Sequence, residues 1–312
     1  MKSTFLLTSL LFASCITQEN INNQPTATCH AETAKPRDTH ENMNALLWMQ
    51  TSTEYHILCA KAYKNAEMAL DAALTSPSAS AAPEQISAKA IWEKANPDKN
   101  DAAFFKIANT DESLPPAIIL DIDETVLDNS PAAAEAIKKR GTFNEEDWNQ
   151  WVKRGEAKAL PGVEKFLQHA MDKNVAIFYI TNRTVDQENV TRKNLEQLKL
   201  PVRQGDDAIL SKGEPRHSDS SDKSSRRAEI AKKHRILLLI GDDLGDFVSV
   251  SKLEPAARKM VAQQYAHLWS QSWVLLPNPT YGSWERCLYP KNLSDAATLE
   301  LKSRKVEELI PK

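Results

Sequence analysis

The sequence contains little glycine, few cysteines and almost no net charge. Glycine accounts for 8 of 312 residues, which excludes a collagen-like or glycine-rich array. The formal charge of -3 lacks the basic excess typical of a nucleic-acid-binding surface, so we expect no nucleic-acid partner. No CxxC pair occurs, which argues against a zinc cluster, and the motifs GxxxxGKS/T, HExxH and GxSxG are absent. Besides Cys15, three cysteines allow one disulfide at most, with partners that the sequence does not specify: Cys29, Cys59 and Cys287.

The hydrophobic stretch near the N-terminus, residues 5–13, is too short to span a bilayer, which takes roughly 20 apolar residues. It has the size of a signal-peptide core, and small residues directly precede Cys15. This arrangement resembles a bacterial lipoprotein box, in which cleavage leaves the cysteine N-terminal and lipid-modified; the alternative is a plain secretory signal. We therefore expect a signal peptide over residues 1–14 and a lipidated flexible tether over 15–40. The tether would anchor the protein in the bacterial cell envelope, and Ile16 favours the outer membrane, facing the periplasm or the surface.

Three short apolar runs are each followed directly by polar residues. They cover residues 117–120, 175–180 and 236–240. Continuous runs of this length are typical of strands buried on both faces of a parallel sheet. Because ligands bind beyond the carboxyl ends of such strands, we expect the polar residues that follow the runs to form one site.

Helical patterns alternate with these runs, which predicts an α/β fold with right-handed crossovers. The predicted helices cover residues 145–156, 161–173, 187–198 and 224–233. Asn144 is the expected cap of the first, and a further helical pattern covers 41–74. We predict one domain over 41–312, with helical additions at 41–100 and 130–160.

The strongest chemical signal is Asp121-Ile-Asp123-Glu-Thr125, directly after the first run. Residues two apart on an extended chain share a face, so both aspartates would reach one small reacting group. One carboxylate can attack phosphorus while its neighbour handles the proton on the leaving oxygen. The alternative is a turn whose aspartates cap a helix.

The other strand ends carry compatible groups. The hydroxyl of Thr181 and nearby backbone N–H groups can hold phosphoryl oxygens. Lys223 can neutralise a phosphate and the attacking carboxylate; Arg226 is the alternative, although it is a poorer point charge at a tight site. Asp242 and Asp246 would repel the first acidic pair unless a cation lay among them. Carboxylate oxygens without Cys or His favour magnesium over zinc.

In this order, the segments resemble the haloacid-dehalogenase-like (HAD-like) phosphatases, and within them the class C acid phosphatases of the bacterial lipoprotein nucleotidase branch. The resemblance extends from about residue 42 to 290. It rests on residues 46–50, 119–129, 147–151, 161–162, 180–183, 239–247 and 277–285. It implies a Rossmann-like core, with a parallel sheet flanked by helices, and a smaller, mainly helical cap and N-terminal region.

The resemblance also implies roles for individual residues. Asp121 would be the nucleophile, and Asp123 the general acid and then the base that activates water. Thr181 and Lys223 would grip the phosphate.

One Mg2+ per active site would be held by the Asp121 carboxylate, the backbone carbonyl of Asp123 and Asp242, with Asp246 completing the acidic group. The substrate would be bound by Trp148 and Tyr281, which match aromatic positions that sandwich a nucleobase or aromatic leaving group, and by Asn182. For the aromatic residues, Trp151 included, the alternative is core or cap packing.

Together these features predict an exported, metal-dependent acid phosphatase with 5'-nucleotidase activity. Its partners would be small-molecule phosphomonoesters, nucleoside monophosphates above all, and a membrane reached through the lipid. Two alternatives stay open: a phosphotransferase with the same mechanism, and a nucleotide-binding lipoprotein without turnover. The sequence also leaves open whether the chain forms a homodimer.

Overall fold

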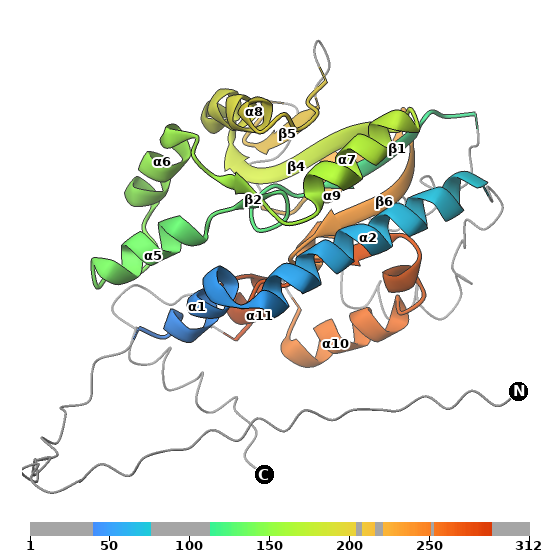
Figure 1. Cartoon of the computed structure of the whole chain (residues 1–312). Helices are drawn as coiled ribbons and strands as arrows, with labels where there is room; N and C mark the ends of the chain where they lie inside the picture. Colours follow the sequence, from blue (N-terminus) through green and yellow to red (C-terminus); the bar gives the residue numbers. More distant parts are fainter. Residues whose placement is uncertain (1–39, 76–112, 204–207, 216–220, 251–252, 289–312) are drawn as a thin grey trace, which may run out of the picture. The chain divides into compact units, whose positions relative to one another are not determined.

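The structure is a computed structural model, and it describes residues 40–75, 113–203, 208–215, 221–250 and 253–288 (Figure 1). These residues all belong to one unit, which covers 40–312. The expected signal peptide, the lipidation site Cys15 and Cys29 lie outside the described residues. Within the described part, no helix combines the length and the apolar character needed to cross a bilayer.

Five parallel strands form the central sheet, in the order β5-β4-β1-β6-β7. Their bounds are β1 Pro116–Leu120, β4 Ala176–Thr184, β5 Ile209–Lys212, β6 Arg235–Gly241 and β7 Trp273–Leu275. The three predicted runs are the three central strands, so the α/β prediction with a parallel sheet is confirmed. Leu120 pairs with Tyr179 and Ile240, so the residues that follow these positions meet at one edge of the sheet.

Helices cover both faces of the sheet (Figure 1). Their bounds are α1 Met43–Thr51, α2 Thr53–Thr75, α5 Ser130–Lys138, α6 Glu145–Arg154, α7 Val163–Asp172, α8 Glu188–Gln197, α9 Ser224–Ala231, α10 Pro255–Gln264 and α11 Ser283–Arg286. Successive residues of β1 pack in different apolar clusters, as their alternation along a strand requires. Ile118 belongs to a cluster with Tyr63 of α2 and Phe166 of α7, whereas Ile119 belongs to a cluster with Ile230 of α9.

The helical pattern over 41–74 is two helices rather than one. Ser52 separates α1 from α2 with an extended backbone (φ -84°, ψ 139°). Its hydroxyl accepts a hydrogen bond from the N–H of Tyr55 at 3.1 Å, which satisfies one of the free N–H groups in the first turn of α2. The helix ends at Thr75, and residues 76–112 lie outside the description.

A helical segment between β1 and α7 carries two of the candidate aromatic residues. It contains α5 and α6 and is closed by an antiparallel pair, β2 (Leu127–Asp128) with β3 (Lys158–Ala159). As predicted, Asn144 caps α6, accepting from the N–H of Asp147 at 2.8 Å. The helix stops at Gly155, whose left-handed conformation (φ 62°) is one that glycine adopts without strain.

Candidate active site

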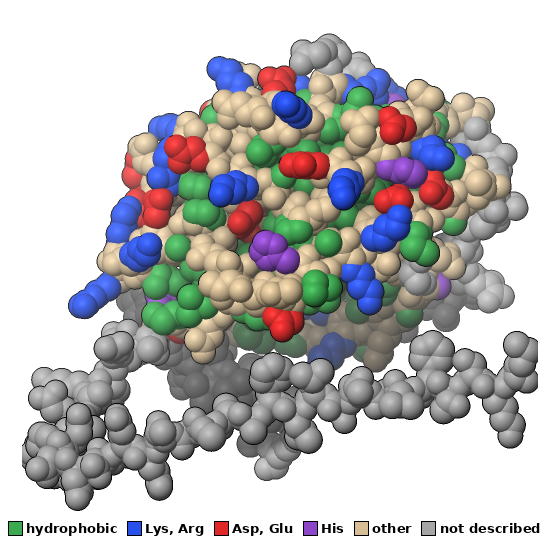
Figure 2. All heavy atoms as spheres, viewed as in Figure 1, with side chains coloured by type: hydrophobic (Ala, Val, Ile, Leu, Met, Phe, Trp, Pro, Cys, Tyr) green, Lys and Arg blue, Asp and Glu red, His purple; other side chains and the backbone are tan. Residues whose placement is uncertain are grey.

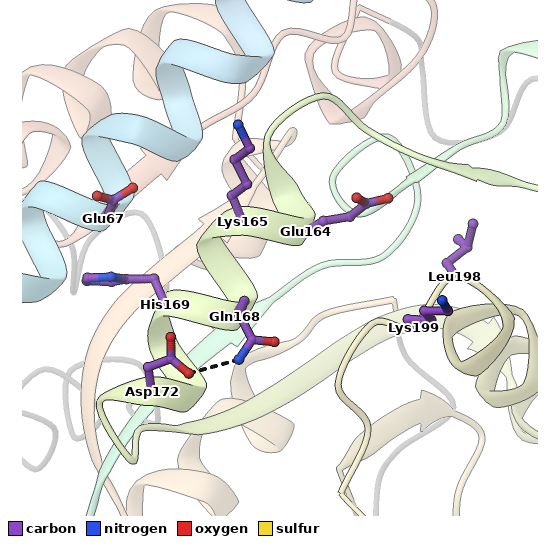
Figure 3. Close-up of a pocket in the computed structure, with 8 residues that line it drawn as sticks. All are labelled: Glu67, Glu164, Lys165, Gln168, His169, Asp172, Leu198 and Lys199. Atoms are coloured by element: carbon purple, nitrogen blue, oxygen red, sulfur yellow. Dashed lines mark hydrogen bonds between the residues drawn. The ribbon is translucent and has the colours of Figure 1, made fainter.

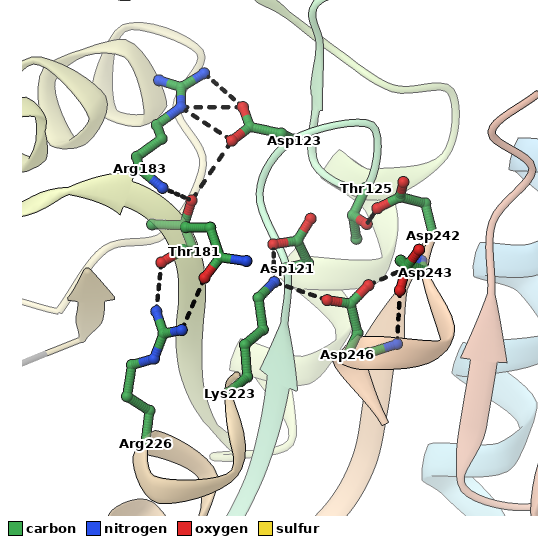
Figure 4. A network of polar contacts seen from close by, with 12 residues as sticks. Asp121, Asp123, Thr125, Thr181, Arg183, Lys223, Arg226, Asp242, Asp243 and Asp246 are labelled. Carbon is green, nitrogen blue, oxygen red and sulfur yellow. Dashed lines mark hydrogen bonds and ion pairs between the residues drawn. The ribbon is translucent and has the colours of Figure 1, made fainter. Parts of the chain in front are cut away.

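Three aspartates converge at the carboxyl edge of the sheet (Figure 4). Asp121 follows β1, whereas Asp242 and Asp246 lie in the turn after β6. One carboxylate oxygen from each lies within 4.8 Å of the others. Gly241 makes this possible, because a side-chain Cβ there would collide with the Asp246 carboxylate. The sheet thus brings together acids that are more than a hundred residues apart in sequence.

Lys223, rather than Arg226, enters this acidic group. Lys223 is 5% exposed, and its Nζ donates to the Asp121 carboxylate and, at 2.7 Å, to Asp246 Oδ1. Arg226 instead donates to the backbone carbonyl of Thr181 at 2.5 Å and to Asn182 Oδ1 at 2.8 Å. The lysine compensates acidic charge inside the cluster, while the arginine fixes the end of β4.

The acidic group is short of positive charge. Burial raises the pKa of Asp121 to about 7; Lys223 opposes the rise and Asp246 adds to it. Desolvation, followed by repulsion from Asp246 and Asp121, raises the pKa of Asp242 well above its ordinary value. Burial would lower the pKa of Lys223, but Asp121 and Asp246 raise it overall. A divalent cation among the three carboxylates would supply the missing charge, and hard oxygen donors without Cys or His suit Mg2+.

Two neighbours orient Asp242 for such an ion. Thr125 Oγ1 donates to Asp242 Oδ1 at 3.1 Å, and Asn278 Nδ2 donates to Oδ2 at 2.8 Å. Hydrogen bonds of this kind fix the direction of a ligating carboxylate and tune its affinity for a metal.

Asp123 lies close enough to Asp121 for its charge to raise the pKa of Asp121, but the two carboxylates contact different cationic side chains. β1 ends at Leu120, and the chain then turns, with Glu124 in the left-handed conformation (φ 57°). The Asp123 carboxylate pairs with Arg183, whose Nη2 lies 2.8 Å from Asp123 Oδ1. It stands beside the acidic group, at the position that Figure 4 draws above Asp121.

Thr181 and Asn182 lie within β4, which continues past the predicted end of the run at residue 180. Thr181 is buried, and its Oγ1 lies 3.5 Å from Asp123 Oδ2 and accepts from the N–H of Arg183 at 3.0 Å. Asn182 is exposed. Thr181 therefore lies beside Asp123, whereas Asn182 accepts a hydrogen bond from Arg226.

The aromatic candidates divide between surface and core. Trp148 on α6 is partly buried, with the Arg183 guanidinium 5.6 Å from its ring centroid. Tyr281 is 44% exposed. The chain just after it is held near the acidic turn, because the N–H of Ser283 donates to Asp243 at 2.5 Å. Trp151 is buried, so the core alternative holds for this residue.

Comparison with known proteins identifies the family. The sequence model described as HAD superfamily, subfamily IIIB (Acid phosphatase) matches residues 8–284. The chain belongs to this family. The structure of the class C acid phosphatase from Bacillus anthracis is similar, with a TM-score of 0.69 and 30% identity over 87% of this chain and 97% of that one. A second structure of that enzyme, with tungstate bound, gives the same values. The resemblance to class C acid phosphatases is confirmed.

Curated plant proteins are similar to this chain over a smaller part of its length. The Stem 31 kDa glycoprotein of Glycine max is 27% identical over 53% of this chain and 65% of its own length. Acid phosphatase 1 of Solanum lycopersicum is 29% identical over 43% of this chain and 52% of its own. The chain therefore spans less than two thirds of the length of these curated relatives.

Sequence reasoning missed three polar residues that shape this site: Arg183, Asn129 and Asn278. Arg183 is 3% exposed although arginine is normally a surface residue. Its place directly after the apolar run 175–180 was the available signal. No local signal distinguishes Asn278, because its contact with Asp242 depends on how the segment after β7 folds back.

Among the described residues, no other group of three acidic, histidine or cysteine side chains is close enough to hold a metal ion. The face in Figure 2 mixes acidic and basic side chains, in keeping with the net charge of -3. A hollow between α2, α7 and α8 is lined by residues outside the acidic group (Figure 3). They are Glu67, Glu164, Lys165, Gln168, His169, Asp172, Leu198 and Lys199. Acidic and basic groups compensate one another there, and none of them belongs to the site at the strand ends.

Proposed function

We propose that the protein is a metal-dependent phosphomonoesterase that forms an aspartyl-phosphate on Asp121. The observation that carries this proposal is the buried Asp121 carboxylate, in contact with Lys223 and grouped with two further aspartates. A dianionic ester can approach a carboxylate only where cationic charge offsets the repulsion. The lysine and a divalent ion together would provide it.

In the proposed reaction each of these groups has one task. An oxygen of Asp121 attacks phosphorus as the bond to the ester oxygen breaks, and Asp123 gives its proton to that oxygen. A water molecule then attacks phosphorus and passes its proton to Asp123; phosphate leaves, and the Asp121 carboxylate is restored. Lys223 neutralises charge on the phosphoryl group. Mg2+ held by Asp121, Asp242 and Asp246 would draw further charge from the phosphoryl oxygens.

We further propose that nucleoside monophosphates are among the substrates, which makes the enzyme a 5'-nucleotidase. Trp148 and Tyr281 support this, because partly exposed aromatic rings bind bases by stacking without demanding one base. Asn182, exposed at the end of β4, would contribute a polar contact. Such a site would accept a broad range of aromatic leaving groups.

We also keep the proposal that Cys15 carries a lipid that anchors the enzyme in the bacterial envelope. Its support is the sequence pattern of an apolar core followed by small residues and cysteine. Cys15→Ser should release the protein from the membrane fraction and abolish incorporation of labelled fatty acid. Retention of the label in that variant would show that Cys15 is not the lipidated residue.

The test of the catalytic proposal uses the wild-type enzyme, Asp121→Asn and the matched control Asp172→Asn, an exposed aspartate on α7. Each is assayed with a nucleoside monophosphate and p-nitrophenyl phosphate, with magnesium and with chelator. Asp121→Asn should lose at least about 10^3-fold in kcat, since the covalent step is removed. Equal turnover in wild type and Asp121→Asn, or no loss with chelator, would overturn the mechanism. Adding a nucleoside acceptor and measuring new nucleotide tests the phosphotransferase alternative.

A further inference from the structure

Arg183 binds the carboxylate of Asp123 through its guanidinium edge. Nη2 and Nε lie 2.8 and 3.0 Å from Asp123 Oδ1, and Nε lies 3.3 Å from Oδ2. The arginine side chain is 2% exposed and that of the aspartate 17%. A buried guanidinium is stable only when it is paired and hydrogen-bonded, so Arg183 needs the Asp123 carboxylate as its partner.

The arginine is itself held from behind. Its Nη1 donates to Thr191 Oγ1 at 3.0 Å, and the threonine hydroxyl donates to the carbonyl of Gln187 at 2.9 Å, within the first turn of α8. Trp148 stacks near the guanidinium from α6. The direction of Arg183 is thus fixed by contacts with α8 and α6 as well as with Asp123.

A second donor acts on the same oxygen of Asp123. Asn129 Nδ2 donates to Asp123 Oδ1 at 2.9 Å, and its amide oxygen accepts from the Trp151 indole at 2.8 Å. The N–H of Asn129 donates to the buried Glu124 at 2.8 Å. Oδ1 therefore receives short hydrogen bonds from two anchored side chains. Oδ2, whose nearest polar neighbours lie at 3.3 and 3.5 Å, is the oxygen left to exchange a proton with the substrate.

We propose that Arg183 is a positioning residue that fixes Asp123 so that Oδ2 delivers its proton to the leaving oxygen. The inference rests on the proposed aspartyl-phosphate reaction and assigns one part of it. The proton moves from Asp123 to the ester oxygen as the phosphorus–oxygen bond breaks, and a proton from water restores it in the second step. The contribution of Arg183 must then depend on how much the leaving group needs a proton.

Two esters separate this role from a structural one. From a nucleoside 5'-monophosphate, the nucleoside leaves as a strongly basic alkoxide unless its oxygen is protonated. From 2,4-dinitrophenyl phosphate, the leaving group is a stable phenolate that needs no proton. In the full chain, Arg183→Met should lower kcat for the nucleotide by about 30- to 100-fold, within the range of a positioned general acid. For the dinitrophenyl ester, kcat should fall less than about 3-fold, because its leaving group needs no general acid. KM should change little. Lys193→Met, at an exposed position of α8, is the matched control and should alter neither.

A double-mutant cycle tests whether Arg183 acts through Asp123. In an Asp123→Asn background, Arg183→Met should cost the nucleotide less than about 2-fold more, because partners in one unit are not additive. Arg183→Lys should recover only part of the loss, since an ammonium cannot engage the carboxylate through a planar fork. Equal losses with both esters, or additive losses in the cycle, would overturn the proposal.

Two further variants, Thr191→Val and Asp121→Asn, separate the role of Arg183 from a folding defect and from the catalytic mechanism. If Arg183→Met does not fold, Thr191→Val keeps the arginine and removes its rear acceptor. The loss should again be confined to the nucleotide, and a loss shared by both esters counts against the role. Asp121→Asn should abolish turnover of both esters. If it does not, the aspartyl-phosphate mechanism is wrong. If Asp121→Asn does abolish turnover but Arg183→Met lowers kcat equally for both esters, only the role of Arg183 is wrong.

Discussion

Magnesium should stabilise this protein far more at pH 8 than at pH 5. The reason lies in Asp121, which has a pKa of about 7 in the folded chain, mainly because of burial, against an ordinary value of 3.8. A carboxyl group whose pKa is raised by folding favours the folded state while it is protonated. Its contribution is complete below about pH 4 and is lost as the pH rises towards 7.

The size of the effect follows from the same values. A rise from 3.8 to about 7 corresponds to about 4 kcal/mol lost from the free energy of unfolding. Asp242, whose pKa is also raised, acts in the same direction. A cation that binds the ionised carboxylates reverses this loss. Only the part of the loss between pH 5 and about pH 7 separates the two conditions, so the stabilisation by magnesium should grow by about 3 kcal/mol between pH 5 and pH 8, or about 6 to 12 °C in Tm for a domain of this size.

Thermal and urea unfolding should be measured at pH 5 and pH 8, each with excess magnesium and with chelator. At each pH, the free energy of unfolding with chelator is subtracted from that with magnesium. This subtraction removes the contribution of titrating groups elsewhere in the chain. Asp172→Asn, in an exposed aspartate, should leave the contrast unchanged, whereas Asp242→Asn should reduce it. A magnesium effect of equal size at both pH values, or none, would refute the reasoning.

Three further changes test the surroundings of the site. Lys223→Met leaves buried carboxylates uncompensated and should destabilise the metal-free protein by about 3–5 kcal/mol in urea unfolding at pH 7; an unchanged midpoint would contradict this. Asn278→Ala removes a donor to Asp242 and should weaken magnesium binding about 10-fold by calorimetry; unaltered affinity would show that the contact is incidental. Trp151→Phe leaves the Asn129 amide oxygen without its indole donor and should cost about 1–2 kcal/mol of stability, which circular dichroism during urea titration can check.

The sequence by itself determined the central strands and the edge of the sheet where the chemistry lies. Strands buried on both faces must be apolar at every position, so β1, β4 and β6 stand out as continuous runs. The edge strands β5 and β7 have only four and three residues, too few for such a signal. The cap of α6 was predictable because its contact joins Asn144 to Asp147, three residues apart.

Only the tertiary structure decided which charged groups meet. Lys223 and Arg226 lie three residues apart in a similar sequence context, and the start of α9 sends one to Asp121 and the other to the end of β4. Asp123 was expected to act beside Asp121, but only the folded chain shows that an arginine holds its carboxylate. Its partner Arg183 is 60 residues away. Such pairings depend on the register of packed strands and on single backbone dihedrals, which no local pattern of residue types encodes.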